Sequence, residues 1–293
     1  MHREGVDAIV VPTDDPHMSE YTAPHFYRRE FISGFTGSAG EFCSASNVIL
    51  SPRLGTAVVT LSHACLFTDG RYHSQAAMEL SQEWTLMRVG VKDVPGVNEF
   101  LSSNLSSATI GIDPLVHSAA AYLKLKQAIE TNNNTIKCLD RNIVDEVWGE
   151  ARPPAPNGKF RVHPLEYAGV SVTEKLASLR RSLNEKKQYA IVSSALDEIM
   201  WLFNIRGSDI PCNPVGISYA IVTLDEAIFF VDGGKLNFEV ISHLNSNGVI
   251  IDAYDNVIDG IKLAARRGSV WMDSRTVNFK LFEYALRVIV TCH

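Results

Sequence analysis

Residues 150–164 have the sequence EARPPAPNGKFRVHP, which divides the chain into two parts of similar length. Four of these fifteen residues are proline, and the stretch shows neither helical nor strand periodicity. Because proline fixes φ and removes an amide donor, this segment suits neither a helix interior nor a central strand. We therefore predict a first domain over residues 1–150, a linker over 151–164 and a second domain over 165–293.

Strand-like and helix-like segments alternate before the linker. Apolar and β-branched runs predict strands at residues 7–12, 41–51, 56–70, 84–89, 108–113 and 135–139. Helical periodicity predicts helices at residues 71–80, 118–131 and 142–148. Such alternation is typical of an α/β fold, in which helices pack on a mixed sheet.

The same alternation recurs after the linker. Ser171 with Glu174 three residues later forms a capping-box pattern, and leucines 176, 179 and 183 share one helical face. Strands are predicted at residues 189–194, 218–224, 227–233, 249–254 and 269–274. The second part is therefore also expected to be an α/β domain.

The two parts resemble distant copies of each other. Three pairs of segments correspond: DAIVV with YAIVS, FISGFTGS (31–38) with FNIRGSD (203–209), and FTDGR (67–71) with FVDGG (230–234). We predict two related α/β domains in tandem. A helix precedes the first strand of the second copy, whereas Met1–Gly5 alone precede that of the first, and the C-terminal residues VIVTCH show no terminating pattern. We therefore expect both chain ends to be trimmed.

Composition excludes several classes of protein. The 293 residues are 46% apolar and 20% charged, as in an ordinary folded domain. A net charge of −6 supplies no field that would attract nucleic acid, and no apolar run reaches the ~20 residues of a membrane span. Five scattered cysteines without a C-x-x-C spacing favour a reduced, cytoplasmic location.

No motif in the sequence predicts a catalytic residue or a metal ligand. The glycines of GFTGSAG (34–40) lack the Lys-Ser/Thr of a phosphate loop and are interpreted as a tight connection. His17, with Asp14 and Asp15 nearby, comes closest to a metal cluster, but without a third ligand type we interpret it as part of a polar loop.

Two charged motifs leave alternatives open. Arg71 of TDGRY (68–72) is expected at the start of a helix, where it could present its guanidinium to a carboxylate or carbonyl, or simply pair with a local acid. Arg206 and Asp209 flank Gly207-Ser208 in a proline-stiffened loop. They indicate either an internal salt bridge that holds a rigid turn or a contact with a ligand.

These motifs occur in an ordered series that resembles the cytosolic, three-domain Xaa-Pro aminopeptidases of the creatinase/prolidase superfamily. The series comprises PTDDPHMSEYTAP, REFISGFTGSAG, FTDGRYHSQA, WTLMRVG, GIDPL, ALDEIMWLFNIRGSDIPCNPV and SYAIV. The resemblance extends from about residue 7 to about residue 274. The chain departs from the family pattern in its short N-terminus and in a longer segment at 45–62, where we expect an extended hairpin.

The resemblance implies two creatinase-like N-terminal domains followed by a pita-bread catalytic domain that lies outside this chain. It also implies two divalent metals, with manganese expected, whose aspartate, histidine and glutamate ligands belong to that third domain. None of those ligand motifs is matched here, so we expect this chain alone to bind no metal and to be inactive. The family's substrate-contacting arginine falls on Arg71.

The family further implies a cytoplasmic homodimer that removes the N-terminal residue from peptides with proline in second position. A different class remains open: aminopeptidase-like domains also serve as metal-free, protein-binding modules in histone chaperones, although those carry long acidic tails. Prolidase and creatinase are alternatives within the superfamily, and the duplicated domain disfavours both. A nucleotide-binding α/β protein is disfavoured by the missing phosphate loop.

Overall fold

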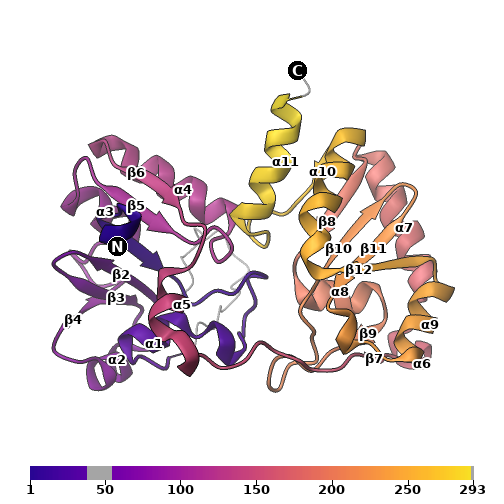
Figure 1. The fold of residues 1–293 in the computed structure, drawn as a ribbon, viewed down its shortest axis with the longest axis horizontal. Coiled ribbons are helices and arrows are strands. Elements are labelled where there is room, and N and C mark those ends of the chain that lie inside the picture. The colour runs from indigo at the N-terminus through magenta and orange to yellow at the C-terminus, as the bar shows by residue number, and fades with distance from the viewer. Residues whose placement is uncertain (38–54, 292–293) are drawn as a thin grey trace. The chain divides into compact units, whose positions relative to one another are not determined.

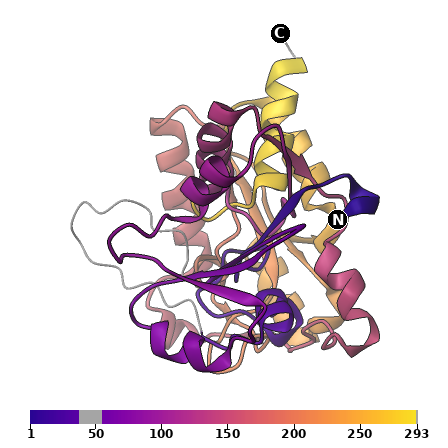
Figure 2. The same cartoon turned by 90° about the vertical axis from the view of Figure 1, so that its left-hand side faces the viewer.

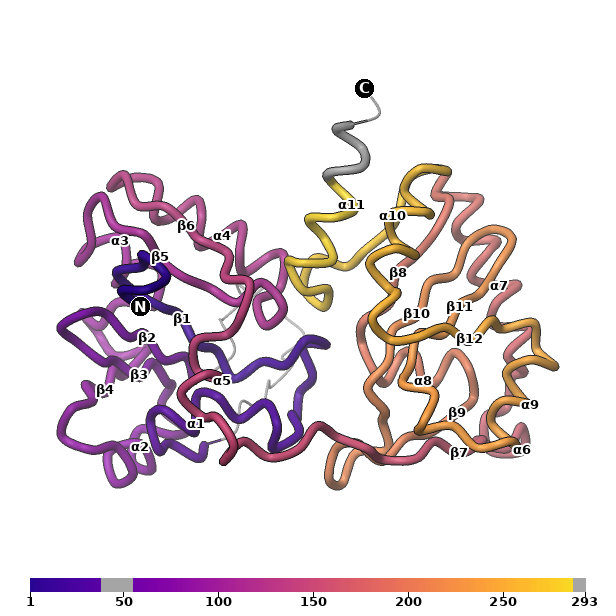
Figure 3. The backbone as a smooth tube through the Cα atoms, in the orientation of Figure 1, coloured from indigo at the N-terminus to yellow at the C-terminus, as the bar shows by residue number. Residues whose placement is uncertain are grey.

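The computed structural model describes residues 1–37 and 55–291. By its internal contacts the chain divides into two compact units, which are described separately below. Unit 1 comprises Met1–Pro16 and Glu20–Pro154, and unit 2 comprises His17–Ser19 and Ala155–His293. The backbone of each unit can be followed by colour in Figures 1 and 3.

Six strands of the described residues form one mixed sheet in unit 1, in the order β4-β3-β2-β1-β5-β6. β1 is antiparallel to β2, β2 is antiparallel to β3, and the pairs β3/β4, β1/β5 and β5/β6 are parallel. The strands are β1 (Ala8–Val11), β2 (Thr56–Thr60), β3 (Ala64–Thr68), β4 (Trp84–Arg88), β5 (Thr109–Ile112) and β6 (Thr135–Cys138).

Helices cover both faces of this sheet because β1 is apolar on both sides. Ala8 and Val10 share a core with helices α3 (Val97–Asn104) and α4 (Ala119–Ile129), which lie side by side in Figure 2. Ile9 and Val11 face a second core. Helices α1 (Arg28–Ser33) and α5 (Ile143–Trp148) contribute to that second core, and α2 (His73–Glu79) packs beside β4.

Unit 2 contains a five-stranded sheet of described residues in the order β12-β11-β10-β8-β13. Its strands are β8 (Ala190–Ser193), β10 (Ser218–Thr223), β11 (Ala227–Val231), β12 (Val249–Ala253) and β13 (Val270–Trp271). A core on one face includes residues of α7 (Val172–Glu185), α8 (Leu196–Leu202) and α9 (Phe238–Ser246). α10 (Val257–Arg267) packs on β10 and against α11 (Phe279–Thr291).

Short elements complete the described chain. β7 (Arg161–Val162) pairs with β9 (Ile205–Arg206), and α6 (Leu165–Ala168) follows β7. Single 3₁₀ turns occur at His2–Glu4, Pro24–Phe26, Glu130–Asn132, Gly149–Ala151, Gly233–Lys235 and Tyr254–Asn256. Part of the segment that the sequence assigns to the linker is therefore a strand of unit 2.

The two units repeat one topology, which confirms the predicted duplication. β8, β10, β11, β12 and β13 have the same order and the same parallel or antiparallel pairing as β1, β2, β3, β4 and β5. β6 has no counterpart among the described residues. Even a turn is repeated: Asp113 after β5 and Asp273 after β13 each accept, at 2.9 Å, a hydrogen bond from the amide two residues on.

Most of the predicted elements are present, and the differences have local causes. The run at 56–70 is two strands rather than one, because a turn at 61–63 folds it into the β2–β3 hairpin. The predicted capping box of Ser171 and Glu174 is present. The prediction at 41–51 and most of the expected hairpin at 45–62 lie outside the described residues. Helix α3 was not predicted, because five of its eight residues are polar and weaken its helical pattern.

Candidate functional site

Arg71 lies in a turn at the end of β3, not in a helix. The helix predicted from residue 71 begins at His73, because Asp69 organises the two preceding residues as a turn. The Arg71 amide donates to Asp69 Oδ1 at 3.1 Å, and the Tyr72 amide donates to the Asp69 carbonyl at 3.0 Å. An aspartate that accepts from the amide two residues later is a common way to fix such a turn.

The guanidinium of Arg71 is anchored on one side only. Its Nε donates to Asp69 Oδ2 at 3.1 Å and to Oδ1 at 3.3 Å, while 43% of the side chain is exposed. Its central carbon lies 5.8 Å from the centre of the Tyr72 ring. Among the described residues, neither terminal NH₂ group has a hydrogen-bond partner, so both can present a two-pronged fork to an incoming carbonyl or carboxylate.

Unit 2 contains the same turn without the arginine. Asp232 follows β11 as Asp69 follows β3, and its Oδ1 accepts the Gly234 amide at 2.9 Å. Gly234 therefore stands where Arg71 stands in unit 1. The repeated turn is a property of the fold, whereas the guanidinium is added to it in unit 1.

Asp209 of the RGSD motif is an internal support of unit 2. Its side chain is fully buried and pairs with Lys235 Nζ at 2.8 Å. It also accepts the amides of Gly158 at 2.8 Å and Ile217 at 2.6 Å. Of the two interpretations left open by the sequence, the internal salt bridge is present. Its cation is Lys235, however, because Arg206 turns away and donates to the carbonyl oxygens of Met200 and Ile205.

His17 lies in a buried polar contact of unit 2 rather than in a metal site. Its Nδ1–H donates to the Ser194 carbonyl at 3.0 Å, which leaves Nε2 to accept from the Tyr254 hydroxyl at 2.9 Å. Its ring centre lies 4.3 Å from that of Tyr219. Nowhere in residues 1–37 and 55–291 do three His, Cys, Asp or Glu side chains gather closely enough to hold a metal ion. The described residues therefore do not fit a metal centre.

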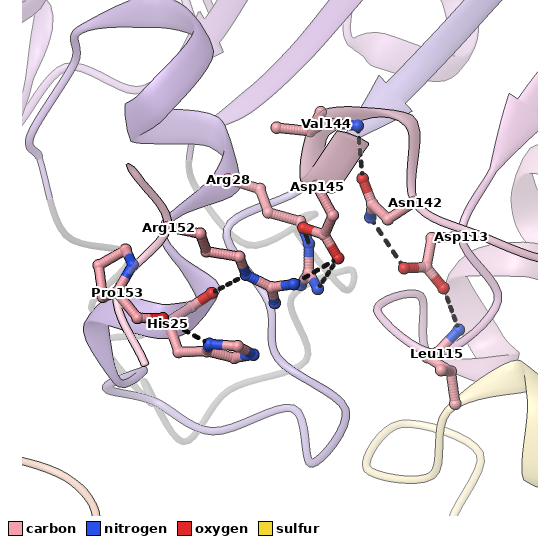
Figure 4. Close-up of polar contacts among 9 residues, drawn as sticks. All are labelled: His25, Arg28, Asp113, Leu115, Asn142, Val144, Asp145, Arg152 and Pro153. Carbon is pink, nitrogen blue, oxygen red and sulfur yellow. Dashed lines mark hydrogen bonds and ion pairs between the residues drawn. The ribbon is translucent and has the colours of Figure 1, made fainter. Parts of the chain in front are cut away.

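A second charged cluster, in unit 1, was missed by the sequence analysis because its members are far apart in the chain. Arg28 Nε and Nη2 donate to the two oxygens of Asp145 at 2.6 and 2.8 Å, and Arg152 Nη1 lies 2.8 Å from the same carboxylate (Figure 4). His25 bonds to the Pro153 carbonyl at 2.8 Å, and burial lowers the pKa of His25. These ion pairs and hydrogen bonds join α1 and α5 to residues 152–153 at the end of unit 1.

The glycine-rich segment after α1 behaves as a tight connection where it is described. Gly34 ends α1 at φ +72°, in the left-handed region that glycine adopts without strain. A Cβ on Gly37 would overlap the ring of Phe35. Gly40 lies outside the described residues.

The creatinase/prolidase N-terminal domain matches this chain twice, over residues 1–145 and over residues 151–291, which contain most of units 1 and 2. The chain therefore consists of two such domains in tandem and belongs to the creatinase/prolidase family. Its relatives include aminopeptidase P2 of Arabidopsis thaliana, 43% identical over 95% of this chain. A probable Xaa-Pro aminopeptidase P of Talaromyces marneffei is 42% identical over 88% of this chain.

A solved structure supports the same family assignment. The crystal structure of X-prolyl aminopeptidase from Caenorhabditis elegans, described as a cytosolic enzyme with a di-nuclear active site, matches 94% of this chain with a TM-score of 0.85 at 33% identity. The chain spans 38% of the length of the Arabidopsis relative and 44% of the C. elegans chain. The matched region thus corresponds to less than half of each relative.

Proposed function

We propose that this chain is the N-terminal, non-catalytic part of an Xaa-Pro aminopeptidase, an enzyme that removes the N-terminal residue from peptides with proline in second position. The observation that carries this proposal is 42–43% identity over most of the chain to proteins named aminopeptidase P. Two divalent metals, with manganese expected, are assigned to the part of the enzyme outside this chain, because the described residues contain no metal-binding cluster.

Arg71 is the residue that we assign to substrate binding. Three features support the assignment: an exposed guanidinium, an Nε held by Asp69, and a fork of NH₂ groups that no described residue occupies. The fork matches a peptide carbonyl or carboxylate through two parallel hydrogen bonds. The rest of the two domains would shape the cleft for the peptide.

We also propose a domain organisation, an oligomeric state and a cellular location for this enzyme. The two domains are assigned to residues 1–150 and 165–293, joined by residues 151–164, of which 161–162 form β7 of unit 2, and the complete enzyme is assigned a homodimer. A cytoplasmic location is supported by the C. elegans neighbour, which is described as cytosolic. Within the described residues, no helix combines the length and apolar character needed to cross a bilayer.

The test compares the complete gene product with residues 1–293 alone. With manganese present, the complete protein should cleave a tripeptide with proline in second position much faster than the same tripeptide with alanine there. Residues 1–293 should be inactive and bind no stoichiometric manganese in calorimetry. A complete protein that is inactive on the proline peptide but binds histones would instead support the protein-binding class.

A further inference from the structure

Four basic side chains gather at one end of unit 2, around the paired strands β7 and β9, which can be followed in Figure 1. The antiparallel pairing of β7 with β9 places Arg161 opposite Arg206. His163 continues the pairing through its amide, which donates to the Asn204 carbonyl at 2.8 Å. Lys175 reaches the same place from α7, with Nζ 2.7 Å from Asn204 Oδ1. We call Arg161, His163, Lys175 and Arg206 the cationic cluster.

Within the described part of the chain, the cationic cluster lacks an acidic ion-pair partner. No carboxylate of the described residues forms an ion pair with any of its four members. Burial, followed by the charge of Arg206, lowers the pKa of both His163 and Lys175. The neighbours that act on these groups electrostatically are therefore other cations. This local positive charge contrasts with the net charge of −6 of the whole chain.

Exposed apolar side chains surround the cationic cluster. Tyr167 and Trp201 are 72% and 56% exposed, and Leu165 and Val170 are exposed as well. They belong to the same surface: Lys175 Nζ lies 4.3 Å from the centre of the Trp201 ring, and the His163 and Tyr167 rings are 6.1 Å apart. The Val170 carbonyl accepts from Asn204. Exposed aromatic residues next to arginine are typical of the energetic centres of protein interfaces.

We propose that this face of unit 2 binds an acidic peptide segment of a partner protein, one that carries aromatic or large aliphatic side chains between its carboxylates. Charge complementarity selects the carboxylates, since Arg161 and Arg206 stand beside each other without an acid. Trp201 and Tyr167 offer apolar and π surface for the side chains between them. Nucleic acid is disfavoured, because Lys175 is buried and the two arginines that remain, on a chain of net charge −6, neutralise few phosphates.

The test uses fluorescence anisotropy of a fluorescein-labelled peptide in which Glu and Phe alternate. At low salt this peptide should bind the protein, and the affinity should fall as salt rises. A peptide with Gln in place of Glu, and one with Ala in place of Phe, should each bind at least roughly 10-fold more weakly. Trp201→Ala and Arg161→Gln should each weaken binding by a similar factor.

Matched controls are available in the same unit. Leu263 is 51% exposed and Arg266 is also exposed, and both lie on α10, which has no part in the cluster, so Leu263→Ala and Arg266→Gln should leave binding unchanged. The proposal is overturned if the Glu–Phe peptide does not bind, if it binds equally well to Trp201→Ala and Arg161→Gln, or if labelled oligothymidylate binds more tightly. Because the readout is peptide binding without turnover, its failure is separate from failure of the proposed aminopeptidase function.

Discussion

Arg71 and Gly234 occupy the same position in two copies of one turn. In both units an aspartate directly follows the third paired strand and accepts the amide two residues later, at 3.1 Å from Arg71 and 2.9 Å from Gly234. The turn is built without any contribution from the side chain at this position. Arg71 is therefore free for a role other than holding the fold, and its surroundings predict what its loss would do.

Arg71→Ala in the complete enzyme should lower kcat/KM roughly 10- to 150-fold, the cost of losing a charge-assisted hydrogen bond to substrate. Arg71→Lys should recover part of this loss, because lysine keeps the charge but not the planar fork. The melting temperature should change little, since the side chain is 43% exposed and pairs with a near neighbour. Steady-state kinetics and thermal unfolding measure both effects.

Arg275→Ala is the matched control for Arg71→Ala. Arg275 also bonds through its side chain to the aspartate two residues before it, and it is exposed, but it lies after β13 of unit 2. It should leave kcat/KM unchanged. If Arg71→Ala retained full kcat/KM and lost thermal stability instead, the residue would belong to folding alone.

Asp69→Ala should lower kcat/KM by about 2- to 5-fold, because the Arg71 guanidinium loses the acceptor that holds its Nε. Combined with Arg71→Ala it should cause little further loss, since Asp69 acts through Arg71. Asp232→Ala removes the equivalent acceptor in unit 2 and should not change kinetics. Fully additive losses in the double variant would contradict a positioning role for Asp69.

Asp209→Asn should lower the free energy of unfolding of unit 2 by about 3–5 kcal/mol, because Lys235 would remain buried without its counter-charge. Asp273→Asn removes an exposed ion pair in the same unit and should cost less than about 1 kcal/mol. Urea denaturation of the two variants measures the difference. Equal losses would mean that the buried Asp209–Lys235 pair contributes no more to the free energy of unfolding than the exposed pair does.

The free energy of unfolding of unit 1 should fall as the pH is lowered below about 6.5. His117 donates from Nδ1 to the Asp113 carbonyl at 2.9 Å, while its Nε2 is buried without a partner in the described part of the chain. Burial lowers the pKa of His117 in the folded state. The unfolded chain therefore binds this proton first as the pH falls, which favours unfolding.

His117→Gln should flatten this pH dependence, although His25, whose pKa burial also lowers, should retain part of it. His63→Gln is the control, because His63 is exposed and bonds to its neighbour Ser62. Thermal unfolding between pH 7 and pH 5.5 measures the slope. A slope that is unchanged in His117→Gln would assign the pH dependence to other groups.

The local elements and the duplication could be predicted from the sequence because they depend on short-range patterns. Runs of β-branched and aromatic residues determine strands such as β8 and β10, Ser171 with Glu174 caps α7, and the shared Asp-Gly turn marks the repeat. The motif series also predicted the family. These signals lie within a few residues of one another, where backbone geometry alone relates them.

Tertiary structure alone decided which charged groups meet. Asp209 is three residues from Arg206 but pairs with Lys235, and Arg28 pairs with Asp145, 117 residues away. The cationic cluster likewise needs β7 paired with β9 and α7 packed nearby. The sequence could not select these partners, because an ion pair depends on the positions of two side chains after distant segments have packed, and apolar burial, not charge, determines that packing.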